Sequence, residues 1–368
     1  MDRGPLTTVL RALVLPLAGT AVLAFAGGAS GTRPTDAPPG RIAVAVNGGL
    51  YVIEPQRAGF GLPVAWTVAG SPAWSPNGRE IAYVAGGYLR TQSPASGRQR
   101  RLMPVGDRFS AGPQWSPRGD RLALMLDSLT RGTTRLVVVD RSGRNRRLIE
   151  RNALPFQVPQ WSPDGRRIAY LAAWGRDDTP AIATIRPDGH GRRVVVAGVL
   201  DQPDALSWSP DGRRIAFLGV TANGRPGIRV ANADGREAHA VAGSGAGDAA
   251  VGLLRWAPDG RRLAFLRWMR DADGGLAYAE LVVAATQGGD ERMLVRTAYI
   301  GALAWSPDGG WLAYVAEDAN DRATVPSSVW IRRADGSDRR RIGRLAEEIN
   351  DAGLSWGLSP RPLPPARR

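Results

Sequence analysis

The chain of 368 residues carries 48 arginine and lysine residues against 34 aspartate and glutamate residues, a formal net charge of +14 at pH 7. It has no cysteine and all of its basic residues are arginine, which excludes disulfides, a thiolate nucleophile, a Schiff-base lysine and the lysine of a phosphate-binding loop. Because His190 and His239 are its only histidines, the chain alone cannot assemble a multi-histidine metal centre, and we predict no cofactor.

The first 40 residues predict export. Arg3 and Arg11 precede an uninterrupted apolar run from Ala12 to Ala26, and small residues follow it. Such a run is typical of a secretory signal peptide and is short for a membrane-spanning helix. We therefore expect residues 1–30 to be a signal peptide or, if they are not cleaved, an N-terminal anchor formed by residues 12–28. A Pro-rich linker follows over residues 31–40, and the rest of the chain is predicted to be extracytoplasmic, either periplasmic or secreted.

A ten-residue phrase organises the remaining sequence. Its typical form is W-S-P-D-G-R-R-I-A-Y, and six copies begin at Trp74, Trp115, Trp161, Trp208, Trp256 and Trp305. The Ser-Pro-Asp-Gly centre predicts a turn, since Pro restricts φ, Asp bonds back to the backbone and Gly accepts a positive φ. The alternating apolar residues on both sides predict strands. Each phrase is therefore predicted to be a β-hairpin.

Most of the phrases are followed by two further predicted strands, joined by a second turn such as Pro187-Asp188-Gly189. Successive phrase tryptophans are 41 to 49 residues apart, which is the length of one four-stranded propeller blade. The fold class predicted is all-β, a β-propeller of four-stranded antiparallel blades over residues 41–358, followed by a Pro/Arg-rich tail over residues 359–368.

The two ends of this region predict how the ring closes. Residues 41–54 look like the second and third strands of a blade that lacks its first strand, and residues 353–357 look like that missing strand. We therefore expect the C-terminal strand to join the N-terminal blade, which removes an exposed sheet edge. Counting Trp356, seven blades are favoured, and six are the alternative.

The repeated phrase resembles the WD40-like repeat of the TolB family, and of propellers attached to prolyl-oligopeptidase-type peptidases. The resemblance covers about residues 41–358 and implies a β-propeller, but its motif is specific for fold and not for activity. A peptidase domain is not expected. In the nearest match to G-x-S-x-G, residues 243–247, Ser244 is second and not third, and no domain-sized segment follows residue 358.

Candidate catalytic and metal-binding residues are few. His190 and His239 are predicted to be solvated at blade edges. The segments Asp271–Gly275 and Asp318–Asp321 could offer oxygen ligands to calcium, but neither has the spacing of an EF-hand loop. The repeated aspartate of the phrase, such as Asp164, is explained by turn geometry. We predict no metal site and expect the protein not to be an enzyme.

Antiparallel topology places the first and third turns of every blade on one face of the ring and the second turn and the inter-blade connection on the other. The first face is predicted to collect arginines, namely Arg146, Arg147, Arg166, Arg167, Arg192, Arg193, Arg213, Arg214, Arg261, Arg262 and Arg339 to Arg341. The opposite face is predicted to collect acidic residues, namely Asp177, Asp178, Asp201, Asp204, Asp248, Asp271, Asp273, Glu317, Asp318 and Asp321. The ring is thus predicted to be a charge-polarised disc.

Three long loops are predicted on the acidic face, over residues 171–181, 267–277 and 316–327. They contain Trp174, Trp268 and Met269, which are the candidate partner-binding residues, because exposed aromatic side chains on a rigid scaffold are enriched at binding hot spots. The alternative is that these side chains cap the hydrophobic ends of the blades.

The function predicted is that of an exported, non-catalytic propeller that binds an envelope protein or peptide. One alternative is a propeller lyase or hydrolase acting on a polysaccharide or small molecule, and another is a basic scaffold on an anionic envelope polymer. Nucleic acid is not expected as a partner, because aromatic residues are not interleaved with the arginine pairs as base stacking requires. Membrane contact is expected only through an uncleaved N-terminal segment.

Overall fold

A computed structural model describes residues 38–56, 63–105, 109–127, 134–155, 158–200, 206–243, 249–273, 275–317, 327–344 and 352–358. The chain divides into Met1–Thr32 and Arg33–Arg368, so the described residues all belong to the second unit. The predicted signal or anchor segment, most of the linker and the Pro/Arg-rich tail lie outside the described residues. No helix in the described ranges is long and apolar enough to cross a membrane.

All regular elements in the described residues are β-strands. The strands of the first half are β1 Arg41–Val46, β2 Gly49–Ile53, β3 Val68–Trp74, β4 Ile81–Ala85, β5 Tyr88–Gln92, β6 Gln99–Pro104, β7 Phe109–Trp115, β8 Arg121–Asp127, β9 Thr134–Asp140, β10 Arg147–Ala153, β11 Gln160–Trp161, β12 Ile168–Trp174, β13 Thr179–Ile185 and β14 Arg193–Ala197. Those of the second half are β15 Leu206–Trp208, β16 Arg214–Val220, β17 Pro226–Asn232, β18 His239–Gly243, β19 Ala249–Trp256, β20 Arg262–Arg270, β21 Leu276–Ala285, β22 Glu291–Thr297, β23 Ile300–Trp305, β24 Trp311–Glu317, β25 Ser327–Arg333, β26 Arg339–Arg344 and β27 Ala352–Gly357.

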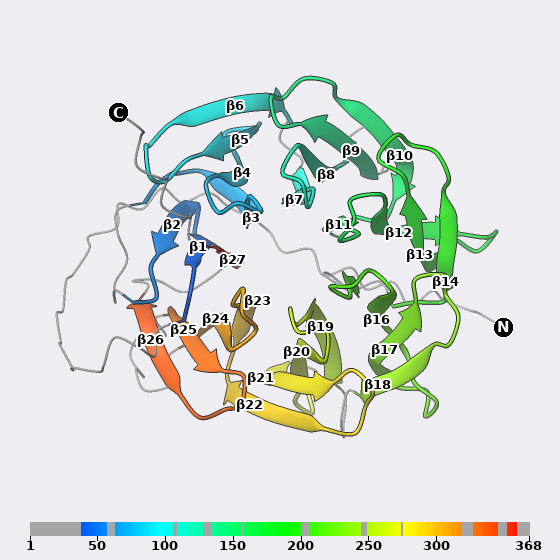
Figure 1. Ribbon diagram of the computed structural model, residues 1–368. Coiled ribbons are helices and arrows are strands. Elements are labelled where there is room, and N and C mark those ends of the chain that lie inside the picture. Colours follow the sequence, from blue (N-terminus) through cyan, green and yellow to red (C-terminus); the bar gives the residue numbers. More distant parts are fainter. Residues whose placement is uncertain are drawn as a thin grey trace. The chain divides into compact units, whose positions relative to one another are not determined.

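The predicted fold class is confirmed. Four four-stranded sheets contain β3–β6, β15–β18, β19–β22 and β23–β26, each in sequence order, and β7–β14 form one eight-stranded sheet. Figure 1 shows the sheets following one another around a ring, with β3, β7, β19, β23 and β27 near the centre and β6, β14, β18, β22 and β26 at the rim. The number of blades stays a prediction.

The predicted closure is confirmed by the remaining sheet, whose order is β2-β1-β27. β27 runs antiparallel to β1 over six residue pairs, from Arg41 opposite Gly357 to Val46 opposite Ala352. The Ser355 hydroxyl accepts a hydrogen bond from the backbone N–H of Trp74, 3.2 Å away, so β27 also contacts β3 of the next sheet. The C-terminal strand β27 therefore pairs with the N-terminal strand β1 and also contacts β3, which closes the ring.

The turn at the centre of the phrase has the predicted chemistry. Asp164 Oδ1 accepts a hydrogen bond from the Ser162 hydroxyl at 2.6 Å and another from the backbone N–H of Arg166 at 3.0 Å. Gly165 has φ of 69°, a conformation in which a β-carbon is unfavourable. The same serine–aspartate pair recurs at Ser209–Asp211 and Ser306–Asp308.

Neighbouring sheets are joined by side chains of the phrase itself. The Trp208 indole N–H donates to the carbonyl of Gln160 in the preceding sheet, at 3.2 Å. A β-carbon added to Gly165 would lie 3.6 Å from Cδ of Pro117 in the preceding turn, so successive turns are in van der Waals reach. Apolar clusters also span sheets, since Leu171 and Ile182 of the eight-stranded sheet belong to one buried cluster with Phe217 of the next sheet. The core therefore lies between the blades, as expected for a ring of stacked sheets.

Candidate functional site

The two ends of the ring differ in the segments that form them. We call motif face the end that carries the phrase turns, residues 75–80, 116–121, 162–167, 209–214, 257–262 and 306–311. We call crossing face the opposite end, which carries turns 86–87, 175–178 and 221–225, the turn that begins at Asp271, and the connections between sheets. Because adjacent strands are antiparallel, the first strand of each sheet ends at the motif face and the second strand ends at the crossing face.

The prediction of long loops at residues 171–181 and 267–277 is wrong. β12 continues to Trp174, which pairs with Thr179, and β20 continues through Met269, which pairs with Tyr278. Cross-strand pairing continues up to a short turn in both segments, so each is a hairpin and not a long loop. Of the third segment, residues 316–327, only the ends belong to the described residues.

Trp174 lies at the crossing face with 47% of its surface exposed. The guanidinium of Arg192 lies over its ring, 5.6 Å from the ring centre. Arg192 Nε in turn donates to Glu150 Oε2 at 3.0 Å and to the Tyr170 hydroxyl at 3.2 Å. One side of the indole is thus supported by a fixed cation, and such a pair restricts the side chain before any partner arrives.

The Glu150 carboxylate on β10 accepts hydrogen bonds from Tyr170 on β12 and from Arg192, and so links side chains of two predicted blades. Burial opposes its ionisation, but hydrogen bonds from the Asn152 N–H, the Tyr170 hydroxyl and the Arg151 N–H, with the charge of Arg192, outweigh burial and lower the pKa of Glu150. Burial and the nearby Glu150 carboxylate raise the pKa of Tyr170, so its hydroxyl stays a donor. The cluster is therefore a carboxylate that accepts from a phenol and a guanidinium at neutral pH.

Trp268 and Met269 are both half-buried, and the structure does not bring them together with Trp174. Trp268 packs against the buried cluster that contains Leu266, Leu281 and Leu303, which fits the alternative that it caps a blade. The sheet β15–β18 comes between the sheets of Trp174 and Trp268 in chain order. Of the three candidate residues, Trp174 is the one with a largely exposed side chain.

Sequence reasoning missed three exposed apolar residues at the crossing face. Trp66, just before β3, is 60% exposed, Val220 at the end of β16 is 42% exposed, and Leu276 at the start of β21 is 45% exposed. Trp66 could have been found from the sequence, because it is a tryptophan outside the repeated phrase and lies on a connection between two sheets. Val220 and Leu276 flank turns and carry no comparable signal.

The arginine pairs of the motif face have divided roles. The second arginine of a pair is structural, since Arg214 lies 5.1 Å over the ring of Trp256 and donates to the Gly260 carbonyl at 3.4 Å. Arg262 repeats this geometry with Trp305 and Gly309 of the next sheet. The first arginine projects into solvent, and the side chain of Arg166 is 85% exposed. Aspartates of the phrase turns lie on the same face, so its charge is mixed and not purely basic.

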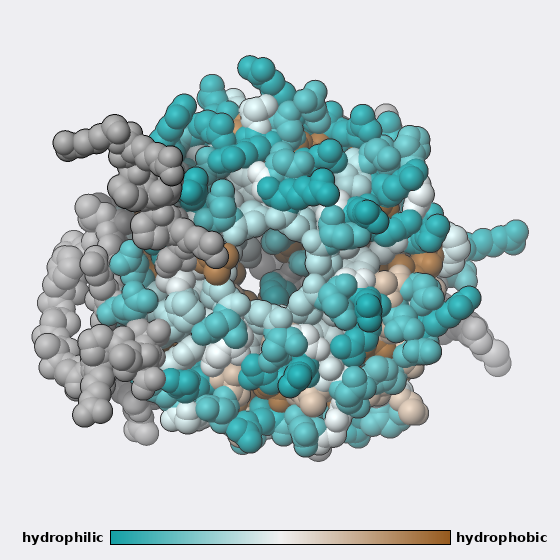
Figure 2. Space-filling model, in the orientation of Figure 1, coloured by the Kyte–Doolittle hydropathy of each residue, from teal (hydrophilic) through white to brown (hydrophobic). Residues whose placement is uncertain are grey.

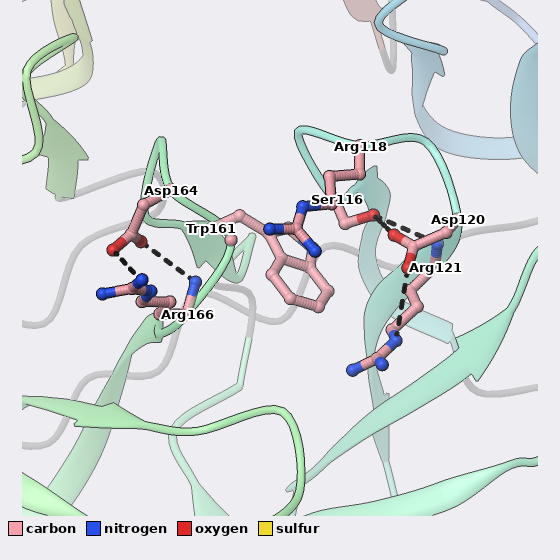
Figure 3. Close-up of a pocket in the computed structure, with 8 residues that line it drawn as sticks. Ser116, Arg118, Asp120, Arg121, Trp161, Asp164 and Arg166 are labelled. Atoms are coloured by element: carbon pink, nitrogen blue, oxygen red, sulfur yellow. Dashed lines mark hydrogen bonds and ion pairs between the residues drawn. The ribbon is translucent and has the colours of Figure 1, made fainter.

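The motif face also carries two shallow hollows. One, of about 100 Å³, lies between neighbouring phrase turns and is lined by Ser116, Arg118, Asp120, Arg121, Trp161, Asp164, Gly165 and Arg166 (Figure 3). The other, of about 450 Å³, shares Asp120 and Arg121 with it and extends to Asp140, Asn145, Arg147 and Asp188. Figure 2 shows one face of the ring, where mostly hydrophilic residues surround a central hollow.

Residues 127–330, more than half of the chain, match the TolB beta propeller domain. The chain belongs to the TolB β-propeller family. No curated protein sequence matches it significantly.

Several solved structures share the propeller fold at low sequence identity. TolB from Acinetobacter baumannii is 16% identical with a TM-score of 0.55, and the match covers 86% of this chain and 66% of that one. Oligogalacturonate lyase from Vibrio parahaemolyticus is 11% identical with a TM-score of 0.57, covering 85% of this chain and 87% of that one. Hydrazine synthase from Kuenenia stuttgartiensis is 15% identical with a TM-score of 0.59, covering 84% and 99%. The chain spans just under two thirds of the Acinetobacter TolB, and likenesses at these identities show the fold alone.

Two of the candidate metal and catalytic residues of this TolB-family propeller, Asp271 and His239, have structural partners. Asp271 Oδ1 accepts hydrogen bonds from the backbone N–H groups of Asp273 and Gly275, at 3.1 and 2.7 Å, so it closes its own turn. His239 is half-buried, and its ring nitrogens lie 3.3 and 3.2 Å from the carbonyls of Glu237 and Thr286. Segment Asp318–Asp321 and Ser244 lie outside the described residues. Within those residues, no three His, Cys, Asp or Glu side chains are grouped to hold a metal ion.

Proposed function

We propose that this chain is an exported, non-catalytic propeller that binds an envelope protein or peptide at the crossing face. The observation that carries the proposal is the placement of the exposed apolar residues. Trp174, Val220 and Leu276 lie at strand ends of the crossing face on three different sheets, and Trp66 lies on the connection that leads into β3. Met293 and Leu358, also exposed, lie on an outer strand and after β27. Apolar groups presented on a rigid scaffold are typical of protein-binding surfaces.

Trp174 is the expected anchor of this surface. Its ring is supported by Arg192, which Glu150 holds in place, so little side-chain freedom remains to be lost on binding. Tryptophan is also enriched among residues that contribute most to protein–protein affinity. Export itself is proposed from residues 1–30, and fractionation of cells that produce the tagged full chain tests it.

The test of partner binding compares two surfaces of the same protein. A Trp66→Ala/Trp174→Ala double variant is used with the wild-type chain to capture cross-linked partners from the native envelope fraction, and Met293→Ala serves as the matched control. Each tryptophan truncation at a hot spot costs about 2 kcal/mol or more, so the pair should weaken binding by more than about 100-fold. Capture by Met293→Ala should equal that by the wild type. A partner retained equally by all three proteins contradicts the proposal, provided that their melting temperatures agree.

A lyase or hydrolase is the second candidate, because an oligogalacturonate lyase shares the propeller fold. The assay for it is turnover of oligogalacturonate by the full chain, with and without added divalent metal. Turnover that the Trp66→Ala/Trp174→Ala variant retains would favour the enzyme and locate its chemistry away from the crossing face.

A further inference from the structure

Four successive phrase turns each present an exposed arginine at the motif face. They are Arg118 after β7, Arg166 after β11, Arg213 after β15 and Arg261 after β19, and we call these four residues the basic arc. In the part of the chain that the structure describes, Arg118, Arg213 and Arg261 form no ion pair and their side chains donate no hydrogen bond. Arg166 approaches Asp164 only at 3.8 Å. Four guanidinium groups therefore keep most of their donors for a ligand.

The other two phrase turns lack the arginine pair. The turn after β23 has Gly310 and Trp311 where the arginine pair stands elsewhere, and Arg333 and Arg340 lie over the Trp311 ring at 4.8 and 5.2 Å. The turn after β3 has Glu80 in place of the second arginine, and Glu80 pairs with Arg141 at 3.0 Å. Arg79 of the turn after β3 is also exposed, so exposed arginines run along the phrase turns from the one after β3 to the one after β19 and stop before the turn after β23.

The positive charge of this stretch is densest beside the β13–β14 turn. Arg167 Nη1 donates to the carbonyl of Gly191 at 3.1 Å. A β-carbon added to Gly191 would lie 3.4 Å from Nε of Arg186 and 3.8 Å from Nη2 of Arg167, so both guanidiniums lie against one backbone segment. Burial and the charges of Arg193 and Arg186 lower the pKa of Arg167. These like charges lie close enough to repel one another.

The neighbouring carboxylates are already used as acceptors by their own turns. Asp140 accepts from the Ser142 hydroxyl, from the backbone N–H groups of Ser142 and Arg144, and from the Asn145 amide. Asp188 accepts from the backbone N–H of His190 at 2.9 Å and pairs with Arg186 at 3.5 Å, and both side chains of this pair are about half exposed. An incoming ligand therefore meets guanidinium donors more readily than free carboxylate acceptors, and it needs oxyanion groups to pair with them.

We propose that the basic arc, with Arg186 and Arg193, binds a linear polyanion through its repeated oxyanion groups. A chain fits better than a small ion, because one exposed guanidinium recurs on each of four successive phrase turns and no single turn gathers all of them. The phrase tryptophans are buried, with 8% of Trp161, 9% of Trp208 and 7% of Trp256 exposed, so the arc offers no aromatic platform for nucleic acid bases. The favoured ligand is an anionic polymer without bases.

Binding of the full-length chain to linear polyphosphate and to poly-L-glutamate, measured from 50 to 200 mM salt, tests the proposal. The variant Arg166→Glu/Arg213→Glu/Arg261→Glu is compared with Arg98→Glu/Arg151→Glu/Arg176→Glu, which changes net charge equally at exposed arginines outside the phrase turns. Each lost contact should lower the slope of log affinity against log salt by about 0.7, so the wild type should lose about 20-fold more affinity than the arc variant over this range. The control variant should retain the wild-type slope.

Loss of binding to either polymer in the arc variant alone supports the proposal, and the polymer affected identifies the oxyanion as phosphate or carboxylate. Three results would overturn it: equal losses in the two triple variants, competition by inorganic phosphate as strong as that by polyphosphate at equal phosphate concentration, and tighter binding of single-stranded DNA than of either polymer. The Trp66→Ala/Trp174→Ala variant should bind the polymers normally, so this proposal and the crossing-face proposal can fail separately.

Discussion

Gly235→Ala should destabilise the propeller much more than the same substitution at Gly224 in the same sheet. Both glycines have a positive φ, 88° at Gly235 and 77° at Gly224. A β-carbon at Gly224 would meet nothing within 4 Å, whereas one at Gly235 would lie 2.0 Å from the carbonyl oxygen of Val195 in the preceding sheet. The pair of variants therefore separates backbone strain from a clash between two sheets.

The expected magnitudes follow from these distances. A left-handed conformation costs an L-residue roughly 1–2 kcal/mol, and both variants incur this cost. In Gly235→Ala the backbone of β14 must also move by more than about 1 Å to reach ordinary contact, and overpacking of this kind adds about 1–3 kcal/mol. The loss should thus be about 2–5 kcal/mol for Gly235→Ala and about 1–2 kcal/mol for Gly224→Ala.

Urea unfolding followed by tryptophan fluorescence measures both free energies, with calorimetry as a second probe of whether unfolding is two-state. Equal losses in the two variants would refute the close approach of the β17–β18 turn to β14. A loss near zero in Gly224→Ala would instead refute the assignment of its backbone conformation.

Three further predictions concern closure, the phrase turn and the inter-blade carboxylate. A chain that ends at Ile349 lacks β27, leaves β1 unpaired on one edge and should aggregate or melt far below the wild type; an unchanged melting temperature would show that β27 does not close the ring. Gly165→Val should lose about 1–3 kcal/mol, because a β-branched residue resists the φ of 69° there, and a loss of only a few tenths in urea unfolding would contradict this. Glu150→Gln should lose roughly 1–3 kcal/mol at pH 7, where the ionised carboxylate accepts from Tyr170 and Arg192. Because the folded state lowers the pKa of Glu150, this stabilisation is present above the unfolded-state pKa of about 4.3 and is lost as the pH falls through the lower folded-state pKa. The stability difference between Glu150→Gln and wild type should therefore shrink in acid, and a difference independent of pH would show that the charge of Glu150 is not what matters.

The phrase turns and the repeat of the blades could be predicted from the sequence alone. The turn formed by Ser162, Asp164 and Gly165 depends on neighbours within five residues, so residue types suffice to predict its hydrogen bonds and its positive φ. The regular spacing of the repeated phrase then predicted a ring of four-stranded blades. The incomplete blades at the two ends of the repeat predicted that β1 pairs with β27. TolB-family membership follows from the same repeated phrase.

The roles that depend on a neighbouring sheet required the tertiary structure. Arg213 and Arg214 are adjacent and chemically identical, yet Arg214 stacks on Trp256 of the next sheet while Arg213 stays exposed. Trp174 and Trp268 were likewise equivalent candidates, and only packing shows that Trp268 joins a buried cluster. Such partners are tens of residues away in the chain, so no local pattern encodes which side chain of a repeated pair is covered and which is left free to bind.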